Sequence, residues 1–416
     1  MTEKTESRSA PRFTAAVVAA QVLAQIGAFT LPALLPGFIA RWSLSATEAG
    51  WLIGTFFAAY VAAVPMLVAL TDRVPARRIY LLGTGLTALS HLGFALVADG
   101  FWSGLALRAV AGIGWAGCYM PGLKAIADRL EGTVQSRAVT WHAAGVGIAG
   151  AASFLVAGAL DALAGPRAAF LFGTGAAATA FCIGAVVMPG TPPHRAAAPG
   201  ALLDFRPVFR NRAAMAWIAG YTVHTWELAA LRAWGVTFFA AVIARQGAPD
   251  WLPGPSVLFT AAGLLGIAVS ITGNEAAQRL GRARLVAAAM GSAAVLSLLT
   301  GWSALVSAPL AAACVLAWNA AIYLDSSALT AGTVQAAEAD RRGATMGLHS
   351  MCGYAGGFLG PLGVGLALDL AGDGAIGWGL AFGHLGAVTL AGLLILRRVG
   401  QRPAAPPAAA ARPAGP

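Results

Sequence analysis

The segment ALTDRVPARRIYLL, residues 69–82, is a short basic loop between two long apolar runs. A related segment, AAQRLGRARLVAA, occurs at residues 276–288 in the second half of the chain. Residues 140–165 and 345–372 form a second pair of related, glycine-rich segments. Two matching pairs in the same order predict two copies of one helical unit in a single chain, an organisation found in transporters with a central cavity.

The composition predicts an integral membrane protein. The 416 residues are 58% hydrophobic and only 11% charged, and the mean hydropathy is +0.72. Soluble domains contain about a quarter charged residues. The apolar runs are long enough to cross the ~30 Å hydrocarbon core of a bilayer. The net charge of +10 does not indicate a nucleic-acid partner, because the basic residues are spread over short loops.

The apolar runs predict an all-α fold with twelve transmembrane helices in two six-helix bundles. The expected spans are 13–39, 51–70, 79–98, 102–126, 138–160, 168–188, 213–240, 256–275, 284–305, 309–334, 344–367 and 376–396. The expected divisions are a cytoplasmic tail at 1–12, an N-terminal bundle at 13–188, a cytoplasmic linker at 189–212, a C-terminal bundle at 213–396 and a disordered tail at 397–416.

The distribution of Lys and Arg predicts the orientation, because these residues are enriched in cytoplasmic loops. All but six of the 27 fall on the side of the termini; the exceptions are Arg41, Arg167 and Arg245 outside, and Arg108, Lys124 and Arg232 within spans. We therefore expect a bacterial-type cytoplasmic (inner) membrane protein with both termini in the cytoplasm. We also expect it to be a monomer.

Enzymatic motifs and cofactor-binding patterns are not found in the sequence. Cys118, Cys182, Cys314 and Cys352 lie in apolar segments without metal-ligand spacing. The phosphate-binding pattern GxxxxGK[ST] is missing, as are HExxH and GxSxG. We expect neither a cofactor nor a metal, and a protein that is not an enzyme.

The segment YTVHTWELAALRAW, residues 221–234, places ionisable groups inside an apolar run. Glu227 lies about 21 Å into the seventh span at 1.5 Å per residue, where a charge costs ~2.5–3.5 kcal/mol on insertion scales. We expect Glu227 to face the interior and to exchange a proton, with His224 on the same face. The alternative is a glutamate held permanently by an arginine as a structural pair.

Four further ionisable residues lie within spans: Arg108, Lys124, Arg232 and Asp325. Arg108 shares a helical stripe with Gly112, Trp115 and Tyr119, and it could bind a carboxylate or neutralise an acid. Lys124 could serve the site or extend to the membrane edge. The expected substrate and proton residues are Glu227, Asp325, Arg108, Arg232, Lys124, His224, Tyr119 and Trp115.

Two further groups have expected conformational roles. Asp72 at the end of span two could accept hydrogen bonds from a neighbouring helix N-terminus and so act as a gate. The expected gating-loop residues are Asp72, Arg73, Arg77, Arg78, Arg279 and Arg282; alternatively, the arginines only satisfy the charge rule. The expected helix-packing glycines, which allow close approach, are Gly112, Gly145, Gly150, Gly356 and Gly360.

The loop at 69–82 resembles the loop after span two in the major facilitator superfamily. The residues of this chain that match the family pattern are Leu70, Asp72, Arg73, Arg77 and Arg78. Val68 and Pro75 stand where the family usually has glycine. The segment RAVAGIG at 108–114 is similar to the span-four pattern of that superfamily. The resemblance implies that spans one, four, seven and ten line a cavity. Arg108, Lys124, Glu227, Arg232 and Asp325 would then lie on cavity helices.

These observations predict a secondary transporter of a small solute that works by proton-coupled alternating access. Three in-span cations against two in-span acids favour an organic or inorganic anion as the substrate. The alternatives are a proton-driven efflux pump for amphipathic compounds and a membrane sensor that has lost transport. The expected partners are a small-molecule substrate, protons and the lipid bilayer.

Overall fold

The computed structural model describes residues 2–71, 73–190, 205–338 and 341–400. The first half of the chain contains seven helices: α1 (Thr2–Gln25), α2 (Thr30–Trp42), α3 (Ala46–Leu70), α4 (Ala76–Leu96), α5 (Phe101–Ala127), α6 (Gly132–Ala164) and α7 (Pro166–Val187). The second half contains α8 (Arg206–Arg210), α9 (Arg212–Gln246), α10 (Pro255–Leu280), α11 (Arg282–Ser303), α12 (Ala308–Ala336), α13 (Arg342–Ala371) and α14 (Ala375–Gly400).

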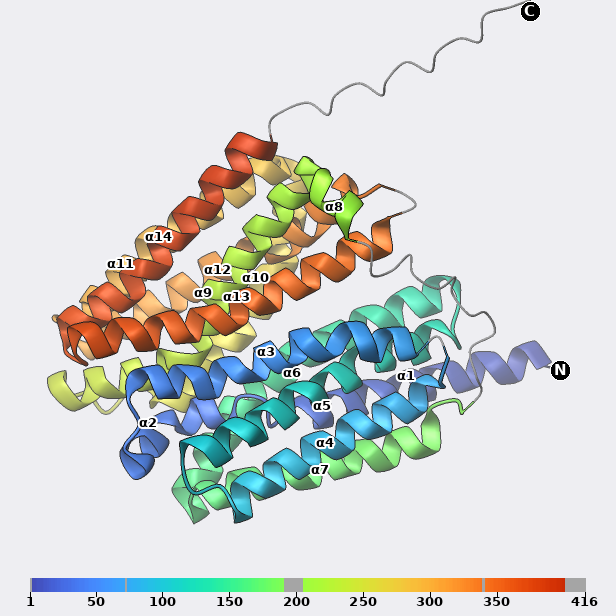
Figure 1. Ribbon diagram of the computed structural model, residues 1–416, viewed down its shortest axis with the longest axis horizontal. Helices are drawn as coiled ribbons and strands as arrows, with labels where there is room; N and C mark the ends of the chain where they lie inside the picture. Colours follow the sequence, from blue (N-terminus) through green and yellow to red (C-terminus); the bar gives the residue numbers. More distant parts are fainter. Residues whose placement is uncertain (1, 72, 191–204, 339–340, 401–416) are drawn as a thin grey trace, which may run out of the picture.

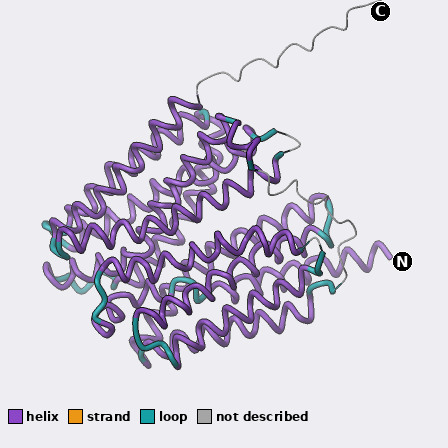
Figure 2. Tube along the Cα trace, in the orientation of Figure 1, coloured by secondary structure: helices purple, strands orange, loops and turns teal. Residues whose placement is uncertain are grey.

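The described residues form helices joined by short loops, and no strand occurs among them (Figure 2). Eleven helical segments of the described chain are long and apolar enough to cross a membrane, and the first of these, Ala10–Trp42, combines α1 and α2. Helix α5, with 27 residues, is not among these eleven segments and is a further long helix of the first bundle. The prediction of an all-helical membrane protein with two helical bundles is confirmed.

The two bundles lie side by side, with α1–α7 in one and α9–α14 in the other (Figure 1). Three helix pairs join them: α3 packs against α13, α6 against α10, and α2 against α9. Helices α11 and α14 lie at the edge of the second bundle that is farthest from the first (Figure 1). The central helices of both bundles therefore meet along one boundary.

The first span is broken in its middle, which the sequence interpretation did not predict. Residues 26–29 form a turn between α1 and α2, in which Ala28 N donates to Gln25 O and Thr30 N donates to Gly27 O. Gly27 makes room for the His91 ring, because a side chain at this position would collide with it. Broken helices within a membrane are tolerated where neighbouring protein covers the freed backbone groups, and they are frequent at transporter binding sites.

Several helices are longer than the predicted spans, at both ends of the bundles. Helix α1 begins at Thr2 instead of residue 13, and α9 ends at Gln246 instead of residue 240. The short helix α8 occupies part of the predicted linker, whose residues 191–204 lie outside the described chain. Of the predicted tail at 397–416, only 397–400 are described, and they continue α14.

The bundles are joined by hydrogen bonds at the end opposite the termini. Ala46 N donates to Asp369 Oδ1 and Thr47 N donates to Asp369 Oδ2, each at 2.8 Å. The same helix start carries a reciprocal cap, in which Ser45 N donates to Glu48 and Glu48 N donates to the Ser45 hydroxyl. A carboxylate at a helix N-terminus is stabilised by the free N–H groups and the helix dipole. Asp369 of α13 therefore holds the start of α3, and we call this contact the Asp369 latch.

Glycines allow the close approach of α13 to its neighbours. A side chain at Gly356 or Gly360 would collide with the backbone carbonyls of Thr222 and Trp226 in α9. A side chain at Gly365 would collide with the carbonyl of Ala46 in α3. Helix α13 is thereby packed closely against α9 in its own bundle and against α3 in the other bundle.

Candidate functional site

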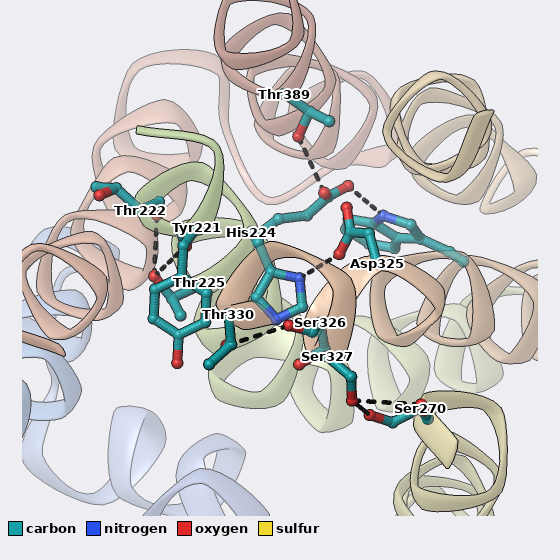
Figure 3. A network of polar contacts seen from close by, with 12 residues as sticks. Tyr221, Thr222, His224, Thr225, Ser270, Asp325, Ser326, Ser327, Thr330 and Thr389 are labelled. Atoms are coloured by element: carbon teal, nitrogen blue, oxygen red, sulfur yellow. Dashed lines mark hydrogen bonds and ion pairs between the residues drawn. The ribbon is translucent and has the colours of Figure 1, made fainter. Parts of the chain in front are cut away.

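The polar stretch of α9 lies inside the second bundle. Asn211 caps the start of α9: its side chain accepts a hydrogen bond from Ala214 N and donates another to Ala336 O of α12. This cap fixes the register of α9 against α12. In the middle of the two helices, His224 Nδ1 lies 2.8 Å from Asp325 Oδ1, and the two side chains are only 2% and 4% exposed (Figure 3). The structure thus brings together two of the residues predicted from sequence.

Glu227 is held by uncharged donors. Trp318 Nε1 donates to Oε1 at 2.5 Å, and the Thr389 hydroxyl donates to Oε2 at 2.9 Å, as Figure 3 shows for Thr389. The residue is 2% exposed. Among the described residues, no Lys or Arg forms an ion pair with this carboxyl. Glu227 is therefore not the partner of an arginine in this structure.

A stack of aromatic rings leads from His224 toward α13. The Tyr221 ring lies between His224 and His349, with centroid distances of 5.7 and 3.8 Å. The two His349 nitrogens face the hydroxyls of Thr333 at 3.1 Å and Thr330 at 3.4 Å. We call the residues His224, Asp325, Glu227, Tyr221 and His349 the α9 polar cluster. It contains the acid–imidazole–hydroxyl groups that a proton could pass between.

Arg232 lies where the two bundles meet. Its guanidinium is 5.0 Å from the ring centroid of Phe29, in the turn of the broken first span, and 5.5 Å from that of Tyr323. It donates to the Tyr323 hydroxyl. No Asp or Glu of the described chain forms an ion pair with it. This cation is balanced by aromatic faces and a hydroxyl, which leaves its charge available to an anion.

Tyrosines from both bundles gather around this point, and sequence reasoning identified only Tyr119. The Tyr60 and Tyr354 rings stack across the boundary with centroids 3.9 Å apart, and Tyr119 and Tyr221 are neighbours of both. Tyr323, which accepts a hydrogen bond from Arg232, brings this group to five of the six tyrosines of the chain. The sequence could have indicated them only by their position within the spans, because tyrosine in membrane proteins is expected near the membrane–water interfaces.

Arg108 lies within the first bundle, between α5 and α3. Its Nε donates to Leu52 O at 3.2 Å, and its guanidinium lies 4.6 Å from the Phe56 ring centroid. Two other residues of the predicted α5 stripe also contact α3. A side chain at Gly112 would collide with Phe56 O, and Trp115 packs edge-on against the Phe56 ring. Arg108 and Arg232 therefore occupy separate environments.

A second polar group in the first bundle was also missed. Gln21 and Gln25 of α1 and His142 of α6 are at most 2% exposed, and none of their side-chain nitrogen and oxygen atoms has a hydrogen-bond partner. The predicted Tyr119 stacks beside His142 at 5.3 Å. Buried polar atoms without partners cost about 1–3 kcal/mol each. The two glutamines lie on α1 just before the break at residues 26–29, and their i, i+4 spacing within the apolar run that begins at Phe13 was the available signal.

The other predicted residues lie away from this region. Lys124 pairs with Asp128 at 3.0 Å on the half-exposed end of α5. Arg282 donates to Gln335 of α12, and Arg73 and Arg279 are exposed. The predicted gate residue Asp72 lies outside the described chain. Arg77 is half-buried and Arg78 exposed.

The predicted glycines pack within each bundle. Gly145 and Gly150 face Val22 and Phe29 of the first span, and Gly112 faces α3. Gly356 and Gly360 face α9, as described above. Across the boundary, Gly147 faces Ile267 and Gly263 faces Ala151, which join α6 to α10. Within the described residues, no group of three or more His, Cys, Asp or Glu side chains is arranged to hold a metal ion.

Two helical bundles, buried ionisable groups in mid-span and a broken first span define a multi-pass membrane protein with the fold of a transporter. The sequence profile of the Major Facilitator Superfamily matches residues 17–361, and the chain belongs to this superfamily. Comparison with individual curated proteins gave no significant match.

Solved structures share the fold at low sequence identity. A bacterial homologue of the human lysosomal transporter Spinster, in an inward-facing and unoccupied conformation, superimposes with a TM-score of 0.72 at 16% identity over 94% of this chain and 95% of that one. The nucleoside transporter NupG gives 0.74 at 13% identity over 94% and 100%. The human organic anion transporter MFSD10 (TETRAN) gives 0.68 at 20% identity over 93% and 99%.

Proposed function

We propose that the protein is a proton-coupled secondary transporter of a small organic anion, and not an enzyme. The observation that carries this proposal is the position of Arg232, a cation without an acidic partner among the described residues, at the boundary of the two bundles. A charge within the bilayer is costly and is retained where it serves a solute or ion pathway. A guanidinium binds a carboxylate through two parallel hydrogen bonds.

The α9 polar cluster supports proton coupling. Asp325 and His224 lie within hydrogen-bonding distance, and Glu227 lies on the same helix as His224. An acid and an imidazole in contact can exchange a proton. Asp325 lies two residues from Tyr323, to which Arg232 donates. A proton that neutralises Asp325 would remove a negative charge from this part of α12 and so change how strongly the boundary attracts an anion. Binding of the proton and the anion would be coupled in this way.

The fold supports alternating access with both termini in the cytoplasm of a cell with a bacterial-type inner membrane. Lys and Arg gather at the termini end, as expected for the cytoplasmic side. The Asp369 latch joins the bundles at the opposite end. The structure then corresponds to a state closed on the outside. A monomer suffices for this mechanism, because both bundles belong to one chain.

Binding of carboxylates to the purified protein tests the role of Arg232. We expect a panel of small mono-, di- and tricarboxylates, screened by thermal shift, to contain a ligand whose affinity falls about 10- to 100-fold in Arg232→Gln. Loss of a hydrogen bond to a charged group costs about 1.5–3 kcal/mol. Lys124→Gln is the matched control, because its cation is already paired with Asp128. Equal loss in both variants, or undiminished affinity in Arg232→Gln, would refute the anion site.

A second candidate function is efflux of amphipathic compounds. The observation that favours it is the gathering of aromatic rings at the boundary, including the Tyr60–Tyr354 stack. Such rings bind apolar and cationic compounds as readily as they shape an anion site. A panel of lipophilic cations in the same thermal-shift screen separates the two. Stabilisation by these cations that survives Arg232→Gln would favour efflux.

A further inference from the structure

The second bundle carries a groove on its outer side at the termini end. It has a volume of about 500 Å³ and lies between α9, α11 and α14. It is lined by Trp217, Ala283, Arg284, Ala287, Ala288, Leu393, Leu396 and Arg397. Because α11 and α14 lie at the edge farthest from the first bundle (Figure 1), this groove is separate from the boundary where Arg232 lies.

Charge is present at one end of the groove only. Arg284 is near the start of α11 and Arg397 is near the end of α14, so both lie at the termini end. Both are exposed, and neither forms an ion pair with an acid of the described chain. Two arginines at the mouth of one groove repel each other unless an anion lies between them.

The remainder of the groove is apolar. Ala287 and Ala288 follow Arg284 by about one turn of α11. On α14, Leu393 precedes Arg397 by about one turn, and Leu396 is the residue directly before it. The alanines leave space that larger side chains would fill. The half-buried Trp217 of α9 forms part of the wall. The charged mouth thus continues into an apolar channel, whose lining residues lie about one helical turn farther from the ends of α11 and α14.

We propose that this groove binds an anionic phospholipid of the leaflet on the termini side. The phosphate of the headgroup would lie between Arg284 and Arg397, and an acyl chain would lie along the alanines of α11. Basic pockets between transmembrane helices on the cytoplasmic side are suited to anionic headgroups. The combination of a basic mouth and an apolar channel fits a lipid better than a soluble phosphate, which would use only the mouth.

Native mass spectrometry of the full chain in detergent tests the proposal, with dioleoyl phosphatidylglycerol as the anionic probe and dioleoyl phosphatidylcholine as the zwitterionic one. We expect one phosphatidylglycerol to remain bound under conditions that remove phosphatidylcholine. Each of Arg284→Gln and Arg397→Gln should reduce its affinity about 5-fold, because one basic residue near an anionic lipid contributes about 1 kcal/mol.

Two variants serve as comparisons. Arg398→Gln removes the same charge one residue along α14 and outside the groove lining, and it should leave binding unchanged. Ala287→Phe fills the apolar channel without changing charge, and it should abolish retention of the lipid. Equal retention of the two lipids, equal loss in Arg398→Gln, or unaltered binding in Ala287→Phe would overturn the proposal. Displacement by free glycerol 3-phosphate at the same concentration would also overturn it, since the groove would then be a site for soluble phosphate.

Discussion

At the scale of single residues, burial without an opposite charge distinguishes the central groups of this protein. Among the described residues, Glu227 accepts hydrogen bonds from Trp318 and Thr389 alone, and Arg232 donates to Tyr323 beside the ring of Phe29. A carboxyl that is paired with a cation would stay ionised, whereas a carboxyl held by neutral donors can bind and release a proton, and a guanidinium without an acidic partner can bind an anion. Their separation on α9 therefore suits a role in coupling more than a structural ion pair.

Glu227→Gln tests this role, because glutamine preserves shape and can still hydrogen-bond to Trp318 and Thr389. We expect the variant to exchange labelled for unlabelled carboxylate across proteoliposomes at a rate within about threefold of the wild type. We expect accumulation driven by an imposed pH gradient to fall at least about tenfold, since the side chain no longer binds and releases a proton. Thr389→Val removes one hydrogen bond and keeps the acid, so it should retain driven accumulation. Undiminished accumulation in Glu227→Gln would exclude Glu227 from coupling.

At the scale of helices, the two copies of the repeat differ at the end opposite the termini. Asp369 in α13 and Asp161 in α6 occupy matching positions of the two glycine-rich segments. Only Asp369 accepts described hydrogen bonds from the other bundle, from the free N–H groups at the start of α3. Helix α10, which packs against α6, begins with Pro255, and proline has no N–H to donate. Among the described residues, the contact between the bundles that Asp369 makes therefore has no counterpart at Asp161, although the repeat would place one there.

Asp369→Asn should weaken closure at this end, because a neutral side chain interacts less with a helix N-terminus. A negative charge near a helix N-terminus contributes about 0.3–1 kcal/mol, so the ratio of the two conformers should shift about 2- to 5-fold. Distances between spin labels at positions 102 and 376, in a variant without native cysteines, should broaden toward larger values. Asp161→Asn is the matched control and should leave the distances unchanged. An identical distance distribution in Asp369→Asn would show that the latch does not hold the bundles together.

At the scale of the whole molecule, the sequence predicted the bundles well because the length of an apolar run is set by the bilayer. It also predicted that Glu227, Asp325 and Arg232 lie within spans, since ionisable groups are costly in lipid wherever their partners lie; their functional roles stay predictions. The partners themselves could not be predicted: Trp318 and Thr389 are distant in sequence from Glu227 and meet it only through packing. The break at residues 26–29 was missed because a single glycine within an apolar run resembles the many others.

The central claim is that movement of a proton through the α9 polar cluster is coupled to movement of an anion past Arg232. The most direct test records carboxylate uptake and luminal pH together in proteoliposomes loaded with a pH-sensitive dye, using the ligand found by the thermal-shift screen and protein-free vesicles as the blank. We predict that luminal pH changes in step with uptake in the wild type. In Asp325→Asn, exchange should continue without a pH change. Carboxylate uptake at constant luminal pH in the wild type, or an undiminished pH change in Asp325→Asn, would contradict the account.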